Sequence, residues 1–202
     1  MSLPLQSIQS FLTELSLKTP TPGGGTVAGV LSSLSSALGN MVTAYSAGKA
    51  SLSEHKQLHT DSIEFLTSAT KEALVLAEAD AEAYQKVNEL WKLPKDDETR
   101  VSKWDKTLSE ATMIPVKTME LSERILITLE TLVGKTNAML SSDLAIAAVT
   151  AEAAARAGFY TAQINIEQMN ESQTKQELIA MCNGLVTSCK KKAANIEASC
   201  GV

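Results

Sequence analysis

Residues 26–47 read TVAGVLSSLSSALGNMVTAYSA and carry two parallel stripes of side chains at helical spacing. The bulky stripe consists of Val27, Leu31, Leu34, Leu38, Met41 and Tyr45. The stripe beside it is small and consists of Ala28, Ser32, Ser35, Gly39, Val42 and Ser46. A helix that is apolar or small over so much of its circumference buries more than one side. The segment therefore predicts the central helix of a helical bundle.

Helical periodicity continues on both sides of this segment. The other expected helices cover about residues 4–17, 54–91, 98–132, 141–165 and 172–198. Pro115 lies inside one of them, where it should produce a kink. Small residues at helical spacing also mark residues 141–165, so another backbone can approach that helix closely. We predict an all-α bundle of about six helices, with residues 1–202 forming a single domain.

Composition limits the functional classes. Hydrophobic residues make up 44% of the chain and aromatic residues only 4%, which suits helix packing better than a β-sandwich. The net charge of -5, from 18 basic and 23 acidic residues, argues against a nucleic-acid partner. We also expect no membrane span and no secretory signal, hence a cytoplasmic protein. Three cysteines near the C-terminus predict free thiols rather than a disulfide framework.

Asp80 is a carboxylate on the apolar face of the expected helix over residues 54–91. That face is formed, at spacings of four and three, by Ala73, Ala77, Asp80, Tyr84, Val87 and Trp91. A buried carboxylate costs free energy unless it is paired or neutral, and desolvation would raise its pKa. Such a group can hold and release a proton near neutral pH. The alternatives are a structural Asp satisfied by another helix, or a face that lines a wet groove.

The glycine-rich segment over residues 19–25, TPTPGGG, separates the first two expected helices. Gly23, Gly24 and Gly25 allow backbone angles that other residues avoid, and the next helix should begin near Thr26. Backbone N–H groups at a helix start suit a phosphate or a carboxylate. The spacing fits neither a Walker motif nor a dinucleotide fingerprint. In isolation, the segment is more typical of a tight turn between packed helices.

The two histidines of the chain, His55 and His59, stand one helical turn apart. That spacing can hold a metal ion, but no acidic residue completes the set on the same face. Their neighbours Glu54, Lys56 and Gln57 predict an exposed face. We therefore expect neither a metal site nor a Ser-His-Asp arrangement.

Three further polar residues lie near expected helix ends. Lys49 follows Gly48 just past the central helix, where a cation suits the helix dipole. Asn137 and Asp143 flank the start of the helix over residues 141–165, where capping or turn roles are the simpler interpretation.

Several segments together resemble the cyclodeaminase family. This family comprises the C-terminal domain of formiminotransferase-cyclodeaminase and stand-alone bacterial relatives, some of them methenyltetrahydrofolate cyclohydrolases. The matching segments occur in the family's order and are residues 22–28 (PGGGTVA), 48–49 (GK), 79–84 (ADAEAY), 93–95 (LPK), 137–143 (NAMLSSD) and 162–165 (AQIN). Thr26 stands where many members have Ser, which keeps the hydroxyl group.

The resemblance implies an all-α homodimer with a folate pocket near the subunit interface. It implies that Asp80 is the catalytic carboxylate and that Lys49, Asn137 and Asp143 are polar residues near the pocket. We assign Gly23, Gly24, Gly25, Thr26 and Tyr84 to substrate binding as well. The glycine segment and Lys49 suit the anionic glutamate tail of a folate or its polyglutamylated form.

The implied reaction takes place at the C1 bridge of tetrahydrofolate. In a cyclodeaminase the aniline nitrogen attacks the formimino carbon and ammonia leaves; in a cyclohydrolase water adds to the methenyl carbon. One buried acid could move protons in either reaction. Neither requires a metal or a cofactor beyond the tetrahydrofolate substrate. The alternative is a non-catalytic helical protein that keeps the fold for folate binding or for another interaction.

Overall fold

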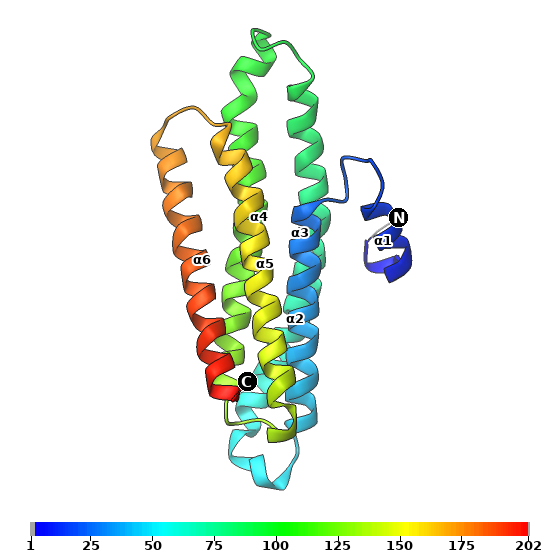
Figure 1. Ribbon diagram of the computed structural model, residues 1–202, viewed down its shortest axis with the longest axis vertical. Helices are drawn as coiled ribbons and strands as arrows, with labels where there is room; N and C mark the ends of the chain where they lie inside the picture. The colour runs from blue at the N-terminus through cyan, green and yellow to red at the C-terminus, as the bar shows by residue number, and fades with distance from the viewer. Residues whose placement is uncertain (1–2, 202) are drawn as a thin grey trace.

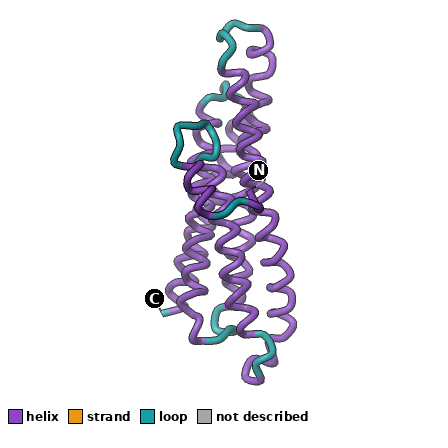
Figure 2. The backbone as a smooth tube through the Cα atoms, turned by 90° about the vertical axis from the view of Figure 1, so that its right-hand side faces the viewer, coloured by secondary structure: helices purple, strands orange, loops and turns teal. Residues whose placement is uncertain are grey.

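Six α-helices form an elongated bundle in the computed structural model, which describes residues 3–201 (Figure 1). The helices are α1 (Ile8–Leu15), α2 (Gly24–Ser46), α3 (Lys56–Trp91), α4 (Glu98–Leu132), α5 (Ser141–Glu167) and α6 (Gln173–Cys200). Short 3₁₀ helices precede α1, α3 and α5, namely η1 (Leu3–Leu5), η2 (Ala50–His55) and η3 (Ala138–Leu140). No strand occurs within residues 3–201, as Figure 2 illustrates, which confirms the all-α prediction.

The five long helices pack as neighbours along the bundle. Helix α2 contacts α3, α4 and α5, while α6 packs on α4 and α5. Figure 1 shows α2 and α5 side by side, with no helix covering their outer side. Helix α1 stands beside the bundle and contains no buried residue. The first helix is also shorter than the predicted residues 4–17, because Ser7 caps it through a 3.1 Å bond from the Ser10 N–H.

Helix α2 buries its small stripe more fully than its bulky one. Ala28, Ser32 and Ser35 are fully buried, whereas Leu34 is 56% and Tyr45 is 65% exposed. The central position of this helix is confirmed. Leu38 and Met41 of the bulky stripe are half-buried against the core, but Leu34 and Tyr45 point away from the bundle. Small side chains face inward because neighbouring backbones come very close.

Contacts of two glycines and two serines show how closely α2 packs against its neighbouring helices. A Cβ on Gly29 would collide with Ala77 of α3, and one on Gly39 would collide with Leu129 of α4. The Ser32 hydroxyl lies 3.0 Å from that of Ser122 in α4. The Ser35 hydroxyl donates to the Ala147 carbonyl of α5 over 2.7 Å. Each serine therefore satisfies its buried polar group by bonding to another helix.

Helix α4 has the predicted bounds and starts at Asp97, whose carboxylate accepts bonds from the N–H groups of Thr99 and Arg100. Its helical structure continues unbroken through Pro115. Helix α5 passes close to this point because Gly158 leaves room for Met119 and the Pro115 carbonyl. The small stripe predicted for this helix is confirmed as its buried side.

The capping interpretation holds for Asn137 and not for Asp143. Asn137 caps η3, where its side-chain oxygen accepts a bond from the Met139 N–H over 3.4 Å. Asp143 lies inside the first turn of α5 with Ser141 and Ser142, and the cap of α5 is Leu140, which makes no side-chain capping bond. The preceding 3₁₀ helix η3 explains the difference, because it leads directly into α5.

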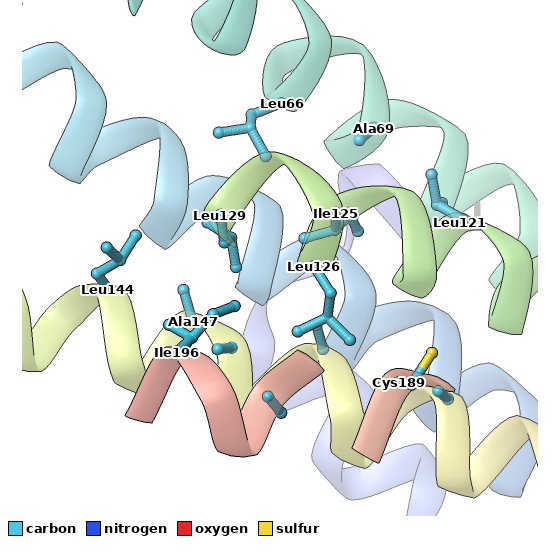
Figure 3. Packing of buried hydrophobic residues seen from close by; sticks show 14 of the residues in the cluster. Leu66, Ala69, Leu121, Ile125, Leu126, Leu129, Leu144, Ala147, Cys189 and Ile196 are labelled. Carbon is cyan, nitrogen blue, oxygen red and sulfur yellow. The ribbon is translucent and has the colours of Figure 1, made fainter. Parts of the chain in front are cut away.

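Large aliphatic side chains fill the space between α3, α4, α5 and α6. Figure 3 shows Leu66, Ile125, Leu126, Leu129 and Ile196 from three of these helices in one cluster. All five are fully buried. A second cluster, which includes Val87, Met119 and Ile166, extends the core toward the α3–α4 connection.

Two segments, Gly24–Ser46 and Ala138–Glu167, are long and apolar enough to span a membrane by length and composition alone. Buried residues make up 50% and 39% of their most apolar windows. The core helices of a soluble bundle have the same property, and both segments contact several other helices.

Candidate active site

Asp80 projects from the middle of α3 toward the first turn of α2. Its carboxylate occupies the space that a Cβ on Gly25 would fill. The backbone N–H of Thr26 donates a hydrogen bond to it. The carboxylate therefore caps the positive end of α2 from a neighbouring helix.

The pKa of Asp80 is raised to about 6, first because burial penalises its charged form. The Thr26 N–H bond acts in the opposite direction and lowers the pKa. A capping carboxylate in water would have a lowered pKa, so desolvation dominates here. The carboxyl group can therefore exchange a proton close to neutral pH.

An open cavity of about 240 Å³ lies in front of this carboxylate. Its walls come from the glycine segment, α3, α4 and the C-terminal half of α5. They consist of Pro20, Thr21, Gly23, Gly24, Gly25, Asp80, Ala83, Tyr84, Val87, Trp91, Ala111, Thr161, Ile164 and Asn165. The part of this α3 face from Asp80 to Trp91 therefore lines an open groove, whereas Ala73 and Ala77 of the same face are buried in the core.

None of the three glycines has an unusual backbone angle, and only Gly25 is required for close approach. Helix α2 begins at Gly24, two residues before the predicted start near Thr26, and Gly23 caps it in an extended conformation. Among the described residues, positive φ angles occur at Gly48, Gly134 and Gly201. The predicted reason for the glycines is therefore wrong at residues 23–25. A side chain at Gly25 would displace the Asp80 carboxylate.

Tyr84 and Thr26 flank the carboxylate on different sides. Tyr84 is 41% exposed and lines the cavity. It shares the predicted face of α3 with Asp80, but at Tyr84 this face borders the cavity and is not buried in the core. Thr26 is 3% exposed, and its hydroxyl oxygen has no hydrogen-bond partner within residues 3–201. Thr26 also lines a second groove, beside α1.

Lys49, Asn137 and Asp143 do not lie near Asp80 within one chain. Lys49 and Asn137 meet at Ser46, whose carbonyl accepts the Lys49 N–H and whose hydroxyl accepts the Asn137 N–H. Asp143 lies in the first turn of α5, at the same end of the bundle. The glycine segment is at the other end of α2, roughly 34 Å away at 1.5 Å per residue. These three residues therefore share one end of the bundle, and the carboxylate lies at the other.

The histidine prediction is wrong for His59. His59 is only 1% exposed, and its Nε2–H donates to the Lys135 carbonyl over 2.7 Å. The ring lies edge-on to His55, with 6.2 Å between the ring centres. His59 thus holds the α4–α5 connection, a long-range contact that the polar residues around it did not reveal. Within residues 3–201, no three His, Cys, Asp or Glu side chains are grouped to hold a metal ion.

The outer wall of the cavity is aromatic, and sequence analysis did not assign it a function. Trp91 meets Trp104 of α4 edge-to-face, with ring centres 6.0 Å apart. Thr161 and Asn165 of α5 complete the wall opposite α3. Trp91 is on the same predicted face as Asp80, and Asn165 is in the segment over residues 162–165. These two sequence patterns could have indicated that Trp91 and Asn165 belong to the cavity wall.

Comparison with known proteins identifies the family of this chain. Residues 7–184 match the family model described as formiminotransferase-cyclodeaminase. The chain is 28% identical over 189 residues to a formimidoyltransferase-cyclodeaminase of Gallus gallus, covering 92% of this chain and 35% of that protein. It is 25% identical over 185 residues to a methenyltetrahydrofolate cyclohydrolase of Methylorubrum extorquens, covering 90% of this chain and 89% of that protein.

A solved structure shares the fold. The formiminotetrahydrofolate cyclodeaminase of Thermotoga maritima superposes with a TM-score of 0.90 at 21% identity, covering 97% of this chain and 96% of that one. The chain spans only about a third of the length of the formimidoyltransferase-cyclodeaminases that it matches.

Proposed function

Because this chain belongs to the formiminotransferase-cyclodeaminase family, we propose that it is a folate enzyme acting at the carbon that joins two tetrahydrofolate nitrogens. The observation that carries the proposal is the Asp80 carboxyl group, with its pKa raised to about 6 at the edge of an open cavity. Relatives named for cyclodeaminase and for cyclohydrolase activity support the same reaction centre.

In the cyclodeaminase reaction, Asp80 moves one proton between two nitrogens. The aniline nitrogen attacks the carbon of the protonated formimino group and gives its proton to the Asp80 carboxylate. The tetrahedral carbon then bears both folate nitrogens and an amino group. Asp80 returns the proton to the amino group, the carbon–nitrogen bond breaks, ammonia departs, and the cationic methenyl bridge remains. A group that titrates near pH 6 suits both transfers.

In the cyclohydrolase reaction, water takes the place of the amino group. Asp80 accepts a proton as water adds to the methenyl carbon. It then donates this proton to the folate nitrogen that leaves. The ring opens to the formyl product as the hydroxyl group on the carbon loses its proton to solvent. The relative from Methylorubrum extorquens, of which the match covers 89%, favours this reaction as the second candidate.

The substrate-binding residues are assigned from the cavity walls. Gly23, Gly24 and Gly25 let the folate approach the α2 backbone, and Tyr84 covers the reacting carbon from α3. Thr26 holds Asp80 in place through its backbone N–H. No metal or cofactor other than the tetrahydrofolate substrate enters this mechanism.

The outer side of the α2–α5 pair supports a homodimer. Helix α2 contains no charged residue. Exposed apolar side chains continue across both helices at Leu34, Tyr45, Ile146, Val149, Tyr160 and Ile164. Several exposed apolar side chains on two neighbouring helices are typical of a subunit interface.

A two-fold axis through the middle of this surface would set α2 antiparallel to its copy. The Lys49 end of one subunit would then lie beside the Gly23 end of the other. This arrangement would bring Lys49, Asn137 and Asp143 of the partner subunit to the cavity that Asp80 borders. Lys49 of the partner subunit would suit the glutamate carboxylates of the folate, with or without polyglutamylation.

A non-catalytic folate-binding or interaction protein is the remaining alternative. Such a protein would gain stability from an apolar residue at position 80, because a desolvated carboxylate is costly. The retained Asp80 therefore favours the enzyme. The free thiols of Cys182, Cys189 and Cys200 support a cytoplasmic location, and the acidic net charge supports no nucleic-acid partner. Two apolar core helices do not require a membrane.

The test is to incubate the purified protein separately with formiminotetrahydrofolate and methenyltetrahydrofolate. A rise in methenyl absorbance with the first substrate identifies a cyclodeaminase. An accelerated loss with the second identifies a cyclohydrolase. Absence of both, together with no binding of a reduced folate in calorimetry, would reject the proposal.

A further inference from the structure

The cavity in front of Asp80 changes in character along its length. The inner end has polar groups, namely the Asp80 carboxyl, the Thr161 hydroxyl and the backbone of the glycine segment. The outer end is apolar, with Val87, Trp91 and Ala111. A ligand that fills the cavity therefore needs one polar part near Asp80 and one flat apolar part near Trp91.

Trp91 is 47% exposed, although it is the largest apolar side chain of the cavity wall. It lies eleven positions after Asp80, which corresponds to roughly 16 Å along the helix at 1.5 Å per residue. Its side chain leans back toward the helix N-terminus, as side chains on helices do, so the indole ring reaches part of this distance toward Asp80. An exposed aromatic face on a cavity wall is typical of a binding surface.

Trp104 supports the Trp91 indole from one side, and a network around Arg100 fixes the backbone beneath it. Trp104 meets it edge-to-face at 87°, and the Trp104 Nε1–H donates to the Gln168 carbonyl over 3.1 Å. The Arg100 guanidinium lies 4.6 Å from the centre of the Trp104 ring. Its Nη1 donates to the Leu93 carbonyl over 2.7 Å and to the Trp91 carbonyl over 3.4 Å. These bonds tie the end of α3 to α4 and α5, so little rotamer entropy is lost when a ring stacks on Trp91.

We propose that Trp91 stacks on the p-aminobenzoyl ring of the folate substrate, with Trp104 and Arg100 as positioning residues. This inference rests on the proposed function, because it takes the substrate to be a folate. The pterin has several hydrogen-bond donors and acceptors and suits the polar inner end. The p-aminobenzoyl ring is planar and apolar, and suits the outer end. The reacting carbon lies between the two rings and so falls beside Asp80.

Calorimetry with 5-formyltetrahydrofolate, a stable reduced folate, tests this assignment on the intact protein. Trp91→Ala should weaken binding about tenfold or more, whereas Trp91→Phe should change it less than about threefold. Trp104→Phe tests the positioning role and should weaken binding less than Trp91→Ala does. Val75→Ala is the matched control and should leave binding unchanged, because Val75 is an exposed apolar side chain of the same helix that does not line the cavity. In turnover assays Trp91→Ala should raise KM more than it lowers kcat, since stacking is uniform binding.

NMR identifies the stacked ring. Nuclear Overhauser contacts are expected between an indole and the p-aminobenzoyl protons of bound 5-formyltetrahydrofolate, and they should vanish in Trp91→Phe. Contacts to the pterin protons instead, or unchanged affinity in Trp91→Ala, would overturn the inference while leaving the proposed function intact. A native protein that neither binds nor converts a folate would overturn both.

Discussion

The Asp80 carboxylate of α3 lies in the space where Gly25 of α2 has no side chain. This contact explains two properties at once. The carboxyl group loses solvent because a helix backbone covers it, and it gains one hydrogen bond from the Thr26 N–H at the same place. Its proton affinity therefore depends on a glycine, and the first predictions concern this pair.

Asp80→Asn should reduce turnover by at least about a hundredfold, the usual scale for losing an acid–base group. In the native enzyme, kcat/KM should fall on the acid side with an apparent pKa near 6, because protonation removes the base. Steady-state rates between pH 5 and 8 would show this limb, and the residual activity of the variant should lack it. A variant with native turnover would give Asp80 a purely structural role.

The same substitution should stabilise the fold above pH 6. The pKa of Asp80 is 3.8 in the unfolded chain and about 6 in the folded one. The free energy of unfolding is thus free of the Asp80 penalty below pH 3.8, and it decreases as the pH rises from 3.8 through 6 because the buried carboxyl group loses its proton. Asp80→Asn should regain up to about 3 kcal/mol at pH 8, since one pKa unit corresponds to about 1.4 kcal/mol. Urea unfolding at pH 4 and pH 8 measures the difference; equal gains at both would contradict the titration argument.

Gly25→Ala should impair catalysis without unfolding the bundle. The new methyl group would push the Asp80 carboxylate out of its position, so we expect kcat to fall by about tenfold or more. Gly184→Ala is the matched control, because a methyl group on this glycine of α6 would meet no atom within 4 Å. It should raise stability by up to about 1 kcal/mol and leave the rate unchanged. Native activity in Gly25→Ala would show that catalysis does not depend on this position of the Asp80 carboxylate.

His59→Ala should lower the free energy of unfolding by about 2–4 kcal/mol, because it leaves a cavity and an unpaired Lys135 carbonyl. The more exposed His55 provides the comparison, and its replacement by Ala should cost less than about 1 kcal/mol. Urea midpoints distinguish the two. A His59 variant as stable as the native protein would mean that the α4–α5 connection is held by other contacts, such as the one between Ser46 and Asn137.

Mixing two inactive variants tests the shared site. If Lys49 serves the cavity of the other subunit, then Asp80→Asn and Lys49→Ala should each be inactive alone. Their mixed dimer would contain one cavity with both native residues. After unfolding and refolding together, activity should recover to about a quarter of native, because half the dimers are mixed and each has one intact site. A Lys49→Ala variant with native activity would place Lys49 outside the site. Two inactive variants whose mixed dimers recover no activity would contradict a site shared between subunits.

Helical periodicity is a local property of the sequence, so it predicts those features of the fold that depend on neighbouring residues alone, such as helix bounds. The bounds of α4 and the buried small side of α5 were predicted correctly from spacing alone. The orientation of α2 was not, because hydrophobicity does not say whether Leu34 faces a helix of the same chain or a second copy. His59 and Trp91 were misjudged or missed for a related reason. Their partners, Lys135 and Trp104, come from other elements and leave no periodic trace.

The buried residues of α2 are no larger than valine, and this limits how the sequence can change over evolutionary time. Enlarging Ala28 or Ser32 would force helices apart, since close-packed interiors do not absorb extra volume. A saturation scan should therefore find the strictest positions of this helix among its smallest residues. Divergent homologues would preserve an upper limit on volume here, even where hydrophobicity and residue identity drift.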